Sequence, residues 1–274
     1  MCKTKANPGA DRLPAIARCN DIFNIGTQIE LTDANCITEI PLDKLHEPDC
    51  HPFQVNDDEA MNTLVESVKQ YGVREPGLAR PRANGGYELL CGNRRKRACE
   101  LANINSMPII IRKMDDDEAT IAMIDSNLQQ RERILPSEKA WAYKLKMEAL
   151  NHSGVKADKL SCEIMAEQTG ESASQIFRFI RLTELIVDLI DKVDTKQIAF
   201  NPAVELSYLS IVEQTAVANA MEKYQIKPSL SQAVRLKKLK QTGELTVGII
   251  EKMLSEEKKS GQNSLTSSNE AREV

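Results

Sequence analysis

Strand signals stop near residue 131, and this change most constrains the fold of the 274-residue chain. Before that point, short apolar runs at Leu78–Arg80, Tyr87–Cys91 and Pro108–Lys113 alternate with stretches of helical periodicity. After it, apolar residues recur only at helical spacing. The sequence therefore predicts an α+β domain over residues 37–131, followed by an all-helical region.

Composition and periodicity set the remaining boundaries. Residues 1–36 mix Pro, Gly, Asn and Asp without a sustained period, so we expect a flexible leader. Residues 132–225 are expected to form a helical DNA-binding domain. Residues 226–258 are expected to form further helices, in which the apolar stretch Val247–Leu254 is a candidate dimerisation surface. The Ser-, Asn- and Glu-rich tail, residues 259–274, is expected to be disordered.

The overall composition excludes several classes of protein. Hydrophobic residues make up 41% of the chain, which supports a packed core. The net charge of −4 argues against a polycation that coats nucleic acid, but it is compatible with a local basic patch. The seven cysteines form no CxxC pair, which indicates a reduced intracellular protein. Without a membrane-length apolar run or a secretory h-region, the expected location is the cytoplasm.

Asn56–Tyr71 is predicted to be the first long helix. Asn56 is the expected N-cap, and Glu59 three residues later resembles the second half of a capping box. Gly72 is the expected C-terminal stop, because glycine readily adopts the left-handed conformation that ends helices.

The stretch Gly86–Ala98 carries the strongest functional signal. An apolar strand meets Gly92, and a strongly basic helix begins at once. The first amides of a helix have no intrahelical partner and lie at its positive end, while Arg94 and Arg95 add forked donors. A glycine also lets a ligand approach the backbone closely. This pattern predicts a phosphate site, for a nucleotide or for DNA, with an ordinary solvated helix face as the alternative.

Lys159–Leu182 has the pattern of a helix-turn-helix, with Gly170 at the turn. Ile176, Phe179 and Ile180 give its second helix an apolar stripe. The more exposed positions, which are the candidate DNA-binding residues, are Ser172, Ser174, Gln175, Arg178 and Arg181. The first four are expected to read bases, and Arg181 is expected to contact a phosphate. Gln and Arg can bind adenine and guanine edges through paired hydrogen bonds in the major groove. An ordinary αα-hairpin with a polar second helix is the alternative.

Two further polar clusters have plainer interpretations. His46, Cys50 and His51 lie close together, but no fourth ligand stands at zinc-site spacing. The predicted helix Ser229–Gln241 is basic and could contact DNA phosphates, although a solvated helix face is slightly favoured. Its cationic residues are Arg235, Lys237, Lys238 and Lys240.

The order of these motifs resembles the ParB/RepB-type partition proteins over about residues 37–210. Each motif alone is weak, but together they stand in the family's own order. The matching segments are Tyr71–Pro76 (the family's hGVxxP), Gly92–Ala98 (GxRRxxA), Ser126–Arg131 (ENxQR), Leu135–Ala140 (NPxEEA) and Gly170–Ser172 (the helix-turn-helix turn).

The resemblance implies a ParB-like N-terminal domain, a fold that is also similar to sulfiredoxin. In this family that domain binds CTP with Mg²⁺ and closes a clamp around DNA, while the helix-turn-helix recognises a short palindromic site. Carried over, Gly92, Asn93, Arg94 and Arg95 hold the triphosphate, and Asn127 serves the metal and the hydrolysis step. A palindromic site implies a homodimer, and a ParA-type ATPase is the partner that the family implies.

The chain departs from the family pattern at several positions. Ser126 replaces the usual glutamate, and a hydroxyl is a weaker magnesium ligand than a carboxylate. Gln130 is an extra residue within the same motif. Phe53 stands where many members of the family have an arginine, so one basic contact is missing. Asn93 replaces the commoner acidic residue before the arginines. Whether CTP is slowly hydrolysed or only bound therefore stays open.

Two alternatives keep the fold and change the function. The first is a helix-turn-helix transcriptional regulator or nucleoid-association protein without a nucleotide switch, in which Arg94 and Arg95 bind the DNA backbone. The second is a sulfiredoxin-like thiol enzyme, because Cys91 adjoins Gly92. The position of Cys91 at the end of an apolar strand favours a buried structural thiol over a redox role. A two-metal nuclease is not indicated, because the sequence shows no carboxylate cluster that would hold two metal ions.

Overall fold

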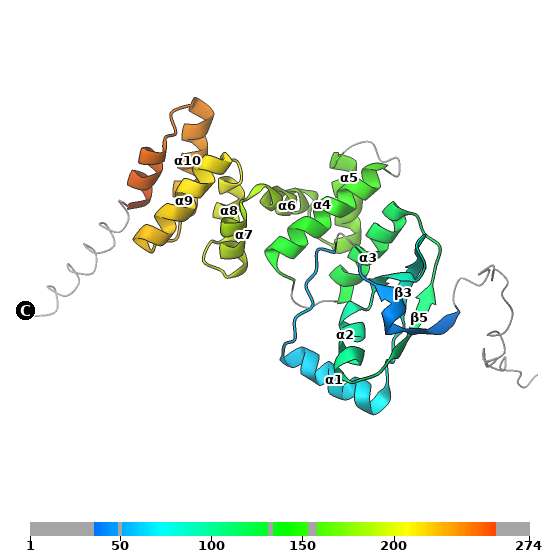
Figure 1. Cartoon of the computed structure of the whole chain (residues 1–274). Helices are drawn as coiled ribbons and strands as arrows, with labels where there is room; N and C mark the ends of the chain where they lie inside the picture. Colours follow the sequence, from blue (N-terminus) through cyan, green and yellow to red (C-terminus); the bar gives the residue numbers. More distant parts are fainter. Residues whose placement is uncertain (1–35, 49–50, 131–133, 153–157, 256–274) are drawn as a thin grey trace, which may run out of the picture. The chain divides into compact units, whose positions relative to one another are not determined.

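The computed structural model describes residues 36–48, 51–130, 134–152 and 158–255 (Figure 1). Strands and helices alternate up to residue 130, and every regular element described after residue 134 is helical. The predicted succession of an α+β domain and a helical region is confirmed. Both the predicted leader, apart from residue 36, and the predicted tail lie outside the described residues.

A mixed five-stranded sheet organises the first domain, with strand order β1-β5-β3-β4-β2. β1 pairs with β5 and β3 with β4 in antiparallel fashion, whereas β3–β5 and β2–β4 are parallel. The turn between β3 and β4 forms at Gly85 and Gly86, both with positive φ. The strands are β1 (Ile37–Pro41), β2 (Leu45–His46), β3 (Gly77–Pro81), β4 (Tyr87–Cys91) and β5 (Ser106–Ile111).

Three helices accompany the sheet: α1 (Glu59–Tyr71), α2 (Asn93–Leu101) and α3 (Asp116–Gln130). Adjacent residues of β4 point to opposite faces of the sheet. Leu89 therefore joins a core with residues of α1 and α2, and Leu90 joins a second core with residues of α3. α2 and α3 therefore pack against opposite faces of one sheet.

The start of α1 corrects the sequence prediction. The helix begins at Glu59 rather than near Asn56, and Asp58 is its N-cap, whose carboxylate accepts a hydrogen bond from the Met61 amide at 2.8 Å. A carboxylate at this position also complements the positive end of the helix. Gly72 ends the helix with φ of 70°, as expected.

The helical region begins with α4 (Pro136–His152), α5 (Asp158–Thr169) and α6 (Ala173–Arg181). Gly170, with φ of 73°, makes the turn between α5 and α6, so the predicted helical hairpin is present. The helices that follow are α7 (Val187–Asp194), α8 (Phe200–Leu206), α9 (Ile211–Tyr224), α10 (Leu230–Thr242) and a final helix over residues 247–255. None of the described helices is both long and apolar enough to cross a lipid bilayer.

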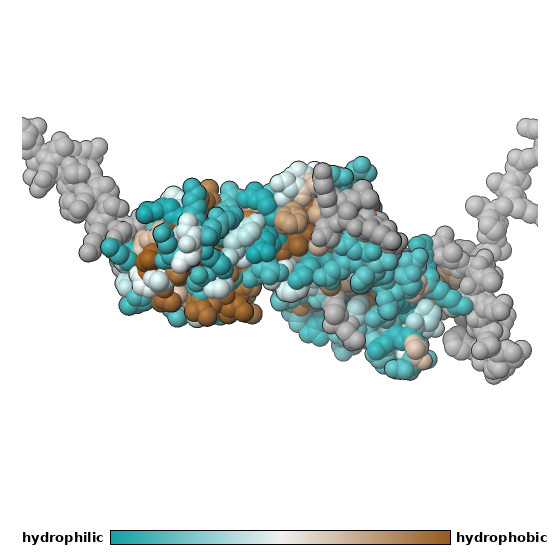
Figure 2. Space-filling view, turned by 90° about the horizontal axis from the view of Figure 1, so that it is seen from above, coloured by the Kyte–Doolittle hydropathy of each residue, from teal (hydrophilic) through white to brown (hydrophobic). Residues whose placement is uncertain are grey.

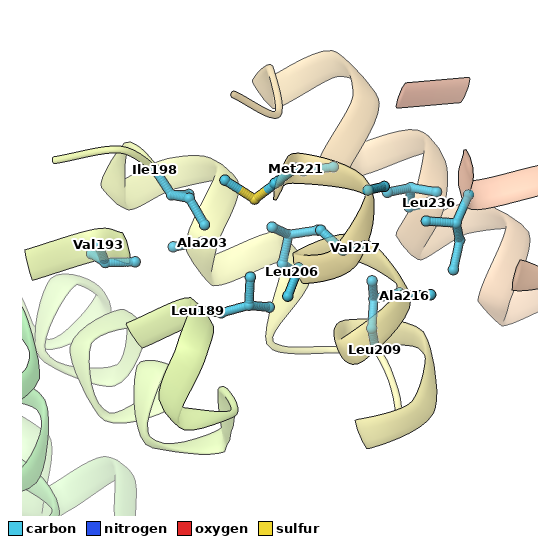
Figure 3. Packing of buried hydrophobic residues seen from close by; sticks show 14 of the residues in the cluster. Leu189, Val193, Ile198, Ala203, Leu206, Leu209, Ala216, Val217, Met221 and Leu236 are labelled. Carbon is cyan, nitrogen blue, oxygen red and sulfur yellow. The ribbon is translucent and has the colours of Figure 1, made fainter. Parts of the chain in front are cut away.

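Helices α7 to α10 enclose an aliphatic core, shown in Figure 3, that includes Leu189, Val217 and Leu236. Ile250 and Leu254 of the final helix are fully buried in the same core. These two residues of the predicted dimerisation stretch are therefore used within the chain.

Exposed apolar side chains gather on the C-terminal helices. Figure 2 shows brown, apolar surface there, whereas the first domain is mainly hydrophilic in this view. Val187, Ile211 and Val212 are 71%, 73% and 69% exposed, the highest values among the large apolar residues described. Gln214 bonds both the Ile186 amide and the Leu209 carbonyl, which brings the starts of α7 and α9 together.

Candidate functional site

The predicted phosphate-binding residues meet around one cavity of about 510 Å³. Its walls come from the second half of α1, the segment that follows Gly72, the start of α2 and the last turn of α3. The lining residues are Leu64, Ser67, Val68, Gly72, Val73, Arg74, Glu75, Gly92, Asn93, Arg94, Arg95 and Asn127. All five residues predicted for nucleotide and metal binding thus lie together, although Asn127 is remote from the others in sequence.

Gly92 forms the turn from β4 into α2. Its φ of 110° lies in the left-handed region that favours glycine, and an added Cβ would come within 3.3 Å of the Gly77 Cα atom. No side chain caps the helix at this position. The positive end of the α2 dipole therefore lies at the cavity without a side-chain acceptor in front of it.

The two predicted phosphate arginines have different environments. The Arg95 guanidinium donates hydrogen bonds to the carbonyls of Glu75 and Pro76 at 2.7 and 2.6 Å, and its side chain is 15% exposed. Arg94 is 32% exposed and lies 3.4 Å from an Asp58 carboxylate oxygen. Arg95 therefore holds the wall of the cavity, while Arg94 offers the more accessible charge.

Arg74 is a third cation at the cavity that the sequence analysis did not single out. Its guanidinium carbon lies 4.3 Å from the ring centre of Tyr71, within range of a cation–π interaction. Its position in the Tyr71–Pro76 motif was the available signal, but the motif was used only to support the family resemblance.

Asn93 fixes the neighbouring loop. This side chain is 8% exposed, and its Nδ2 donates to His51 Nε2 at 2.8 Å. His51 Nδ1 in turn donates to the Phe53 carbonyl at 2.7 Å. Both ring nitrogens of His51 are thus engaged within the chain. Cys50, the neighbouring residue of the weighed zinc cluster, lies outside the described residues.

Asn127 and Glu75 supply oxygen atoms at the cavity that suit a hard cation. Asn127 Nδ2 donates to the Met123 carbonyl at 2.8 Å, which leaves the amide oxygen as its acceptor. Glu75 supplies the carboxylate, with its side chain 78% exposed. Within the described ranges, no three potential His, Cys, Asp or Glu ligands cluster together. This donor set fits Mg²⁺ that arrives with phosphate oxygens and water as its main ligands.

Cys91 is a buried thiol in the core of the domain. Burial raises its pKa, against smaller opposing effects of a Ser126 hydrogen bond and the Arg95 charge. The residue is only 7% exposed, and Sγ lies 3.8 Å from the Ala122 carbonyl oxygen. A buried thiol that resists ionisation is a poor nucleophile, which weighs against the thiol-enzyme alternative.

The predicted DNA-binding residues divide into two groups along α6. Ser172 and Ser174 are exposed at its N-terminal end, where Ser172 caps the helix, and Gln175 is half-buried beside them. Arg178 and Arg181 are instead fastened to residues around α8. Arg178 bonds the Asn201 side chain at 2.5 Å, and Arg181 donates to the Ser207 carbonyl at 2.8 Å.

Phe177 was missed as a surface residue of α6. It is 50% exposed and follows Ser174 by three positions, so both side chains lie on the same side of the helix. The sequence analysis used the apolar residues of this helix only for its buried stripe.

The basic helix α10 is held by ion pairs. Lys237 lies 2.9 Å from Glu205, and Lys240 lies 3.2 Å from Glu213. These pairs join α10 to α8 and α9, which supports a structural use of both lysines. Arg235 and Lys238 are the exposed cations of this helix.

A comparison with protein families assigns the first domain. Residues 26–128 match the model of the ParB N-terminal domain, and residues 26–35 of that match lie outside the described part. The chain carries a ParB N-terminal domain. The cavity between α1, α2 and α3 lies within this ParB N-terminal domain.

The similarity to known proteins extends beyond the ParB N-terminal domain. A nucleoid occlusion protein of Listeria monocytogenes serotype 4a (strain HCC23) is 32% identical over 179 residues, 65% of this chain and 59% of that protein. A probable chromosome 1-partitioning protein ParB of Deinococcus radiodurans is 30% identical, over 65% of this chain and 55% of that protein. The chain thus spans less than two thirds of the length of these relatives.

Among solved structures, one similar protein is the C-terminally truncated chromosome-partitioning protein ParB of Caulobacter crescentus, complexed to the centromeric parS site. It is 21% identical, and the alignment covers 80% of this chain and 99% of that one, with a TM-score of 0.45.

Proposed function

We propose that this chain is a sequence-specific DNA-binding protein of the partition class, regulated by CTP. The observation that carries the proposal is the cavity that joins the uncapped start of α2, Arg94 and Asn127. CTP with Mg²⁺ occupies this cavity, and the α5–α6 hairpin reads a palindromic site as part of a homodimer.

The geometry of the cavity supports a nucleotide ligand. Its volume of about 510 Å³ is within the range of small-molecule sites. Phosphate charge would be met by the α2 dipole and by the guanidiniums of Arg74 and Arg94. Asn127 and Glu75 would supply oxygen ligands to Mg²⁺, and the ion would add positive charge against the phosphates. The preference for CTP over other nucleotides comes from the family resemblance.

The exposed polar start of α6 supports DNA binding. Ser172, Ser174 and Gln175 stand at the end of the helix that enters the major groove in helix-turn-helix proteins. The relatives are proteins of nucleoid occlusion and chromosome partitioning. Their similarity supports the same class here and supports association with the nucleoid. The ParA-type ATPase partner comes from the family resemblance.

The proposal is tested by measuring binding of CTP, ATP, GTP and UTP, with and without Mg²⁺, by calorimetry. Wild-type protein should select CTP, and Arg94→Ala should weaken its binding at least about tenfold, since a charged hydrogen bond to phosphate is lost. Arg97→Ala is the matched control, because Arg97 lies on the same helix but pairs with Asp57 away from this cavity. Equal or absent binding of all four nucleotides would contradict the proposal.

A regulator without a nucleotide switch is the second candidate. The position of Ser126 favours it, since this residue does not line the cavity. The cavity accordingly lacks a carboxylate from the α3 motif. A regulator of this kind would bind its DNA site with unchanged affinity in the presence of every nucleotide.

A further inference from the structure

One face of α4 carries a polar stripe directed at the helix-turn-helix. Lys139, Tyr143 and Lys146 are spaced by four and three residues, which places them on one side of the helix. Ala142, on another side, packs in the core with Phe53 and Leu90 of the ParB N-terminal domain. α4 is therefore shared between the two regions of the chain.

Lys146 is the most deeply buried charged residue that the structure describes, with no exposed side-chain surface. Its ammonium donates hydrogen bonds to Asp125 of α3 and to Gln168 of α5. A buried charge is very unfavourable unless it is paired. The position of this ammonium therefore ties α3, α4 and α5 to one another.

Asp125 and Asn127 relate Lys146 to the nucleotide cavity. Asn127 lines the cavity, and Asp125 precedes it by two residues on α3. Two residues turn a helix by about 200°, so the two side chains leave α3 on nearly opposite sides. A ligand that displaces α3 through Asn127 also displaces the counter-ion of Lys146.

A second polar link leads to the start of the DNA-reading helix. Lys139 and the Tyr143 hydroxyl both bond the carboxylate of Glu171, which immediately precedes the α6 N-cap Ser172. A cavity of about 460 Å³ lies beside these links and is lined by Asp125, Lys139, Tyr143, Gln168 and Glu171 among others. Space that apolar packing does not fill allows the helices to shift relative to one another.

We infer that Lys146 is a positioning residue that couples the nucleotide cavity to the helix-turn-helix. When α3 moves, the buried ammonium must follow Asp125 or lose its counter-ion, and Gln168 transmits the movement to α5. The inference rests on the proposed function, since it assumes that the cavity binds CTP and that the α5–α6 hairpin binds DNA.

The test measures this coupling in the full-length protein. The Kd for CTP is determined with and without a saturating DNA duplex that wild-type protein has selected from a random-sequence pool. The ratio of the two values gives the coupling, typically about 5- to 150-fold in allosteric proteins, and the effect of CTP on DNA affinity must equal it. Far-UV circular dichroism and thermal unfolding verify that each variant is folded.

Lys146→Met should bring the ratio to about one, while each ligand alone binds within about threefold of its wild-type affinity. Lys144→Met is the control and should keep the wild-type ratio, because Lys144 lies on the same helix but is 29% exposed and 3.9 Å from Glu184. Should Lys146→Met fail to fold, the double variant Asp125→Asn/Lys146→Met removes both charges and is measured instead.

The outcomes separate the two proposals. CTP and DNA binding with a wild-type coupling ratio in Lys146→Met overturns the role of Lys146 and leaves the proposed function intact. Binding of both ligands without coupling in wild-type protein overturns the role of Lys146 and also the regulation by CTP. Absence of CTP binding in wild-type protein overturns both proposals. Loss of CTP binding in Lys146→Met without DNA also overturns the coupling role, since the residue would then build the cavity itself.

Discussion

The Arg95 guanidinium lies 2.6 Å from the backbone carbonyl of Pro76, so a residue of the phosphate motif holds the opposite wall of its own cavity. Arg95→Ala should therefore lower the free energy of unfolding by about 1.5–3 kcal/mol, the usual range for hydrogen bonds from a charged donor. Urea unfolding measures this change in stability. Calorimetry should show that nucleotide binding is weakened as well.

Arg94→Ala should also weaken nucleotide binding but leave stability nearly unchanged, because its side chain is more exposed. Arg95→Lys should retain part of the stability that Arg95→Ala loses, because a single nitrogen, Nη1, donates to both carbonyls and an ammonium nitrogen also carries several donors. If Arg95→Ala unfolds at the wild-type urea concentration, Arg95 does not hold the wall.

Gly92 should tolerate no side chain. Gly92→Ala places a Cβ 3.3 Å from the Gly77 Cα atom at a φ of 110°, so we expect a loss of stability of about 1–3 kcal/mol and weaker nucleotide binding. Gly248→Ala is the matched control, because an added Cβ there meets nothing within 4 Å. In a helix the latter change should be neutral or stabilising by up to about 1 kcal/mol. Equal effects of the two changes would argue against a special backbone conformation at Gly92.

Alkaline pH should destabilise the protein through buried weak acids. Burial raises the pKa of the thiols of Cys91 and Cys99, and it also raises the pKa of the Tyr143 hydroxyl. A group with a raised folded-state pKa contributes stability that is fully present below its unfolded pKa and is lost as pH rises through the folded pKa. For the thiols the ordinary value is 9.0, so urea midpoints should be constant up to about pH 8 and fall above pH 9.

Cys91→Ala provides the comparison for this pH dependence, because it should reduce the alkaline loss. Alkylation at pH 7.5 gives an independent measurement, in which exposed Cys36 should react and Cys91 should not until urea is added. Rapid alkylation of Cys91 in the folded protein would restore the thiol-enzyme alternative.

Glycines in the sequence predicted several ends of helices and turns correctly. Gly72 marked the observed end of α1, and Gly170 marked the turn between α5 and α6. The first helix was misplaced at its start because Asn56 and Asp58 are both good N-caps, and only the structure shows which one meets a helix amide. α7 was not predicted as a separate helix, although its apolar residues complete the C-terminal core.

The environment of a side chain was much harder to predict than its membership of the site. Lys144 and Lys146 are two residues apart with the same chemistry, but one is partly exposed and the other fully buried. Their difference depends on α3 and α5, which the sequence does not place against α4. Arg95 is likewise less exposed than Arg94 because the segment after Gly72 lies against the Arg95 guanidinium.

Gln175 should contribute to the sequence specificity of DNA binding. It stands at the start of α6 beside exposed Ser174, and a paired hydrogen bond from glutamine to adenine is worth about 1–3 kcal/mol of discrimination. Gln175→Ala should weaken binding to the selected duplex by about 5- to 150-fold and leave binding to random DNA unchanged. Arg178→Ala should instead lower stability, because Arg178 fastens α6 to Asn201.

Fluorescence anisotropy at several salt concentrations distinguishes base contacts from phosphate contacts. Loss of a base contact should leave the salt dependence as in wild-type protein, whereas loss of a phosphate contact makes it shallower. Gln241→Ala, an exposed glutamine of α10, is the control and should change neither quantity. If Gln175→Ala weakens binding to selected and random duplexes equally, then Gln175 does not read the sequence, and specificity must come from the shape of the DNA or from other residues of α6.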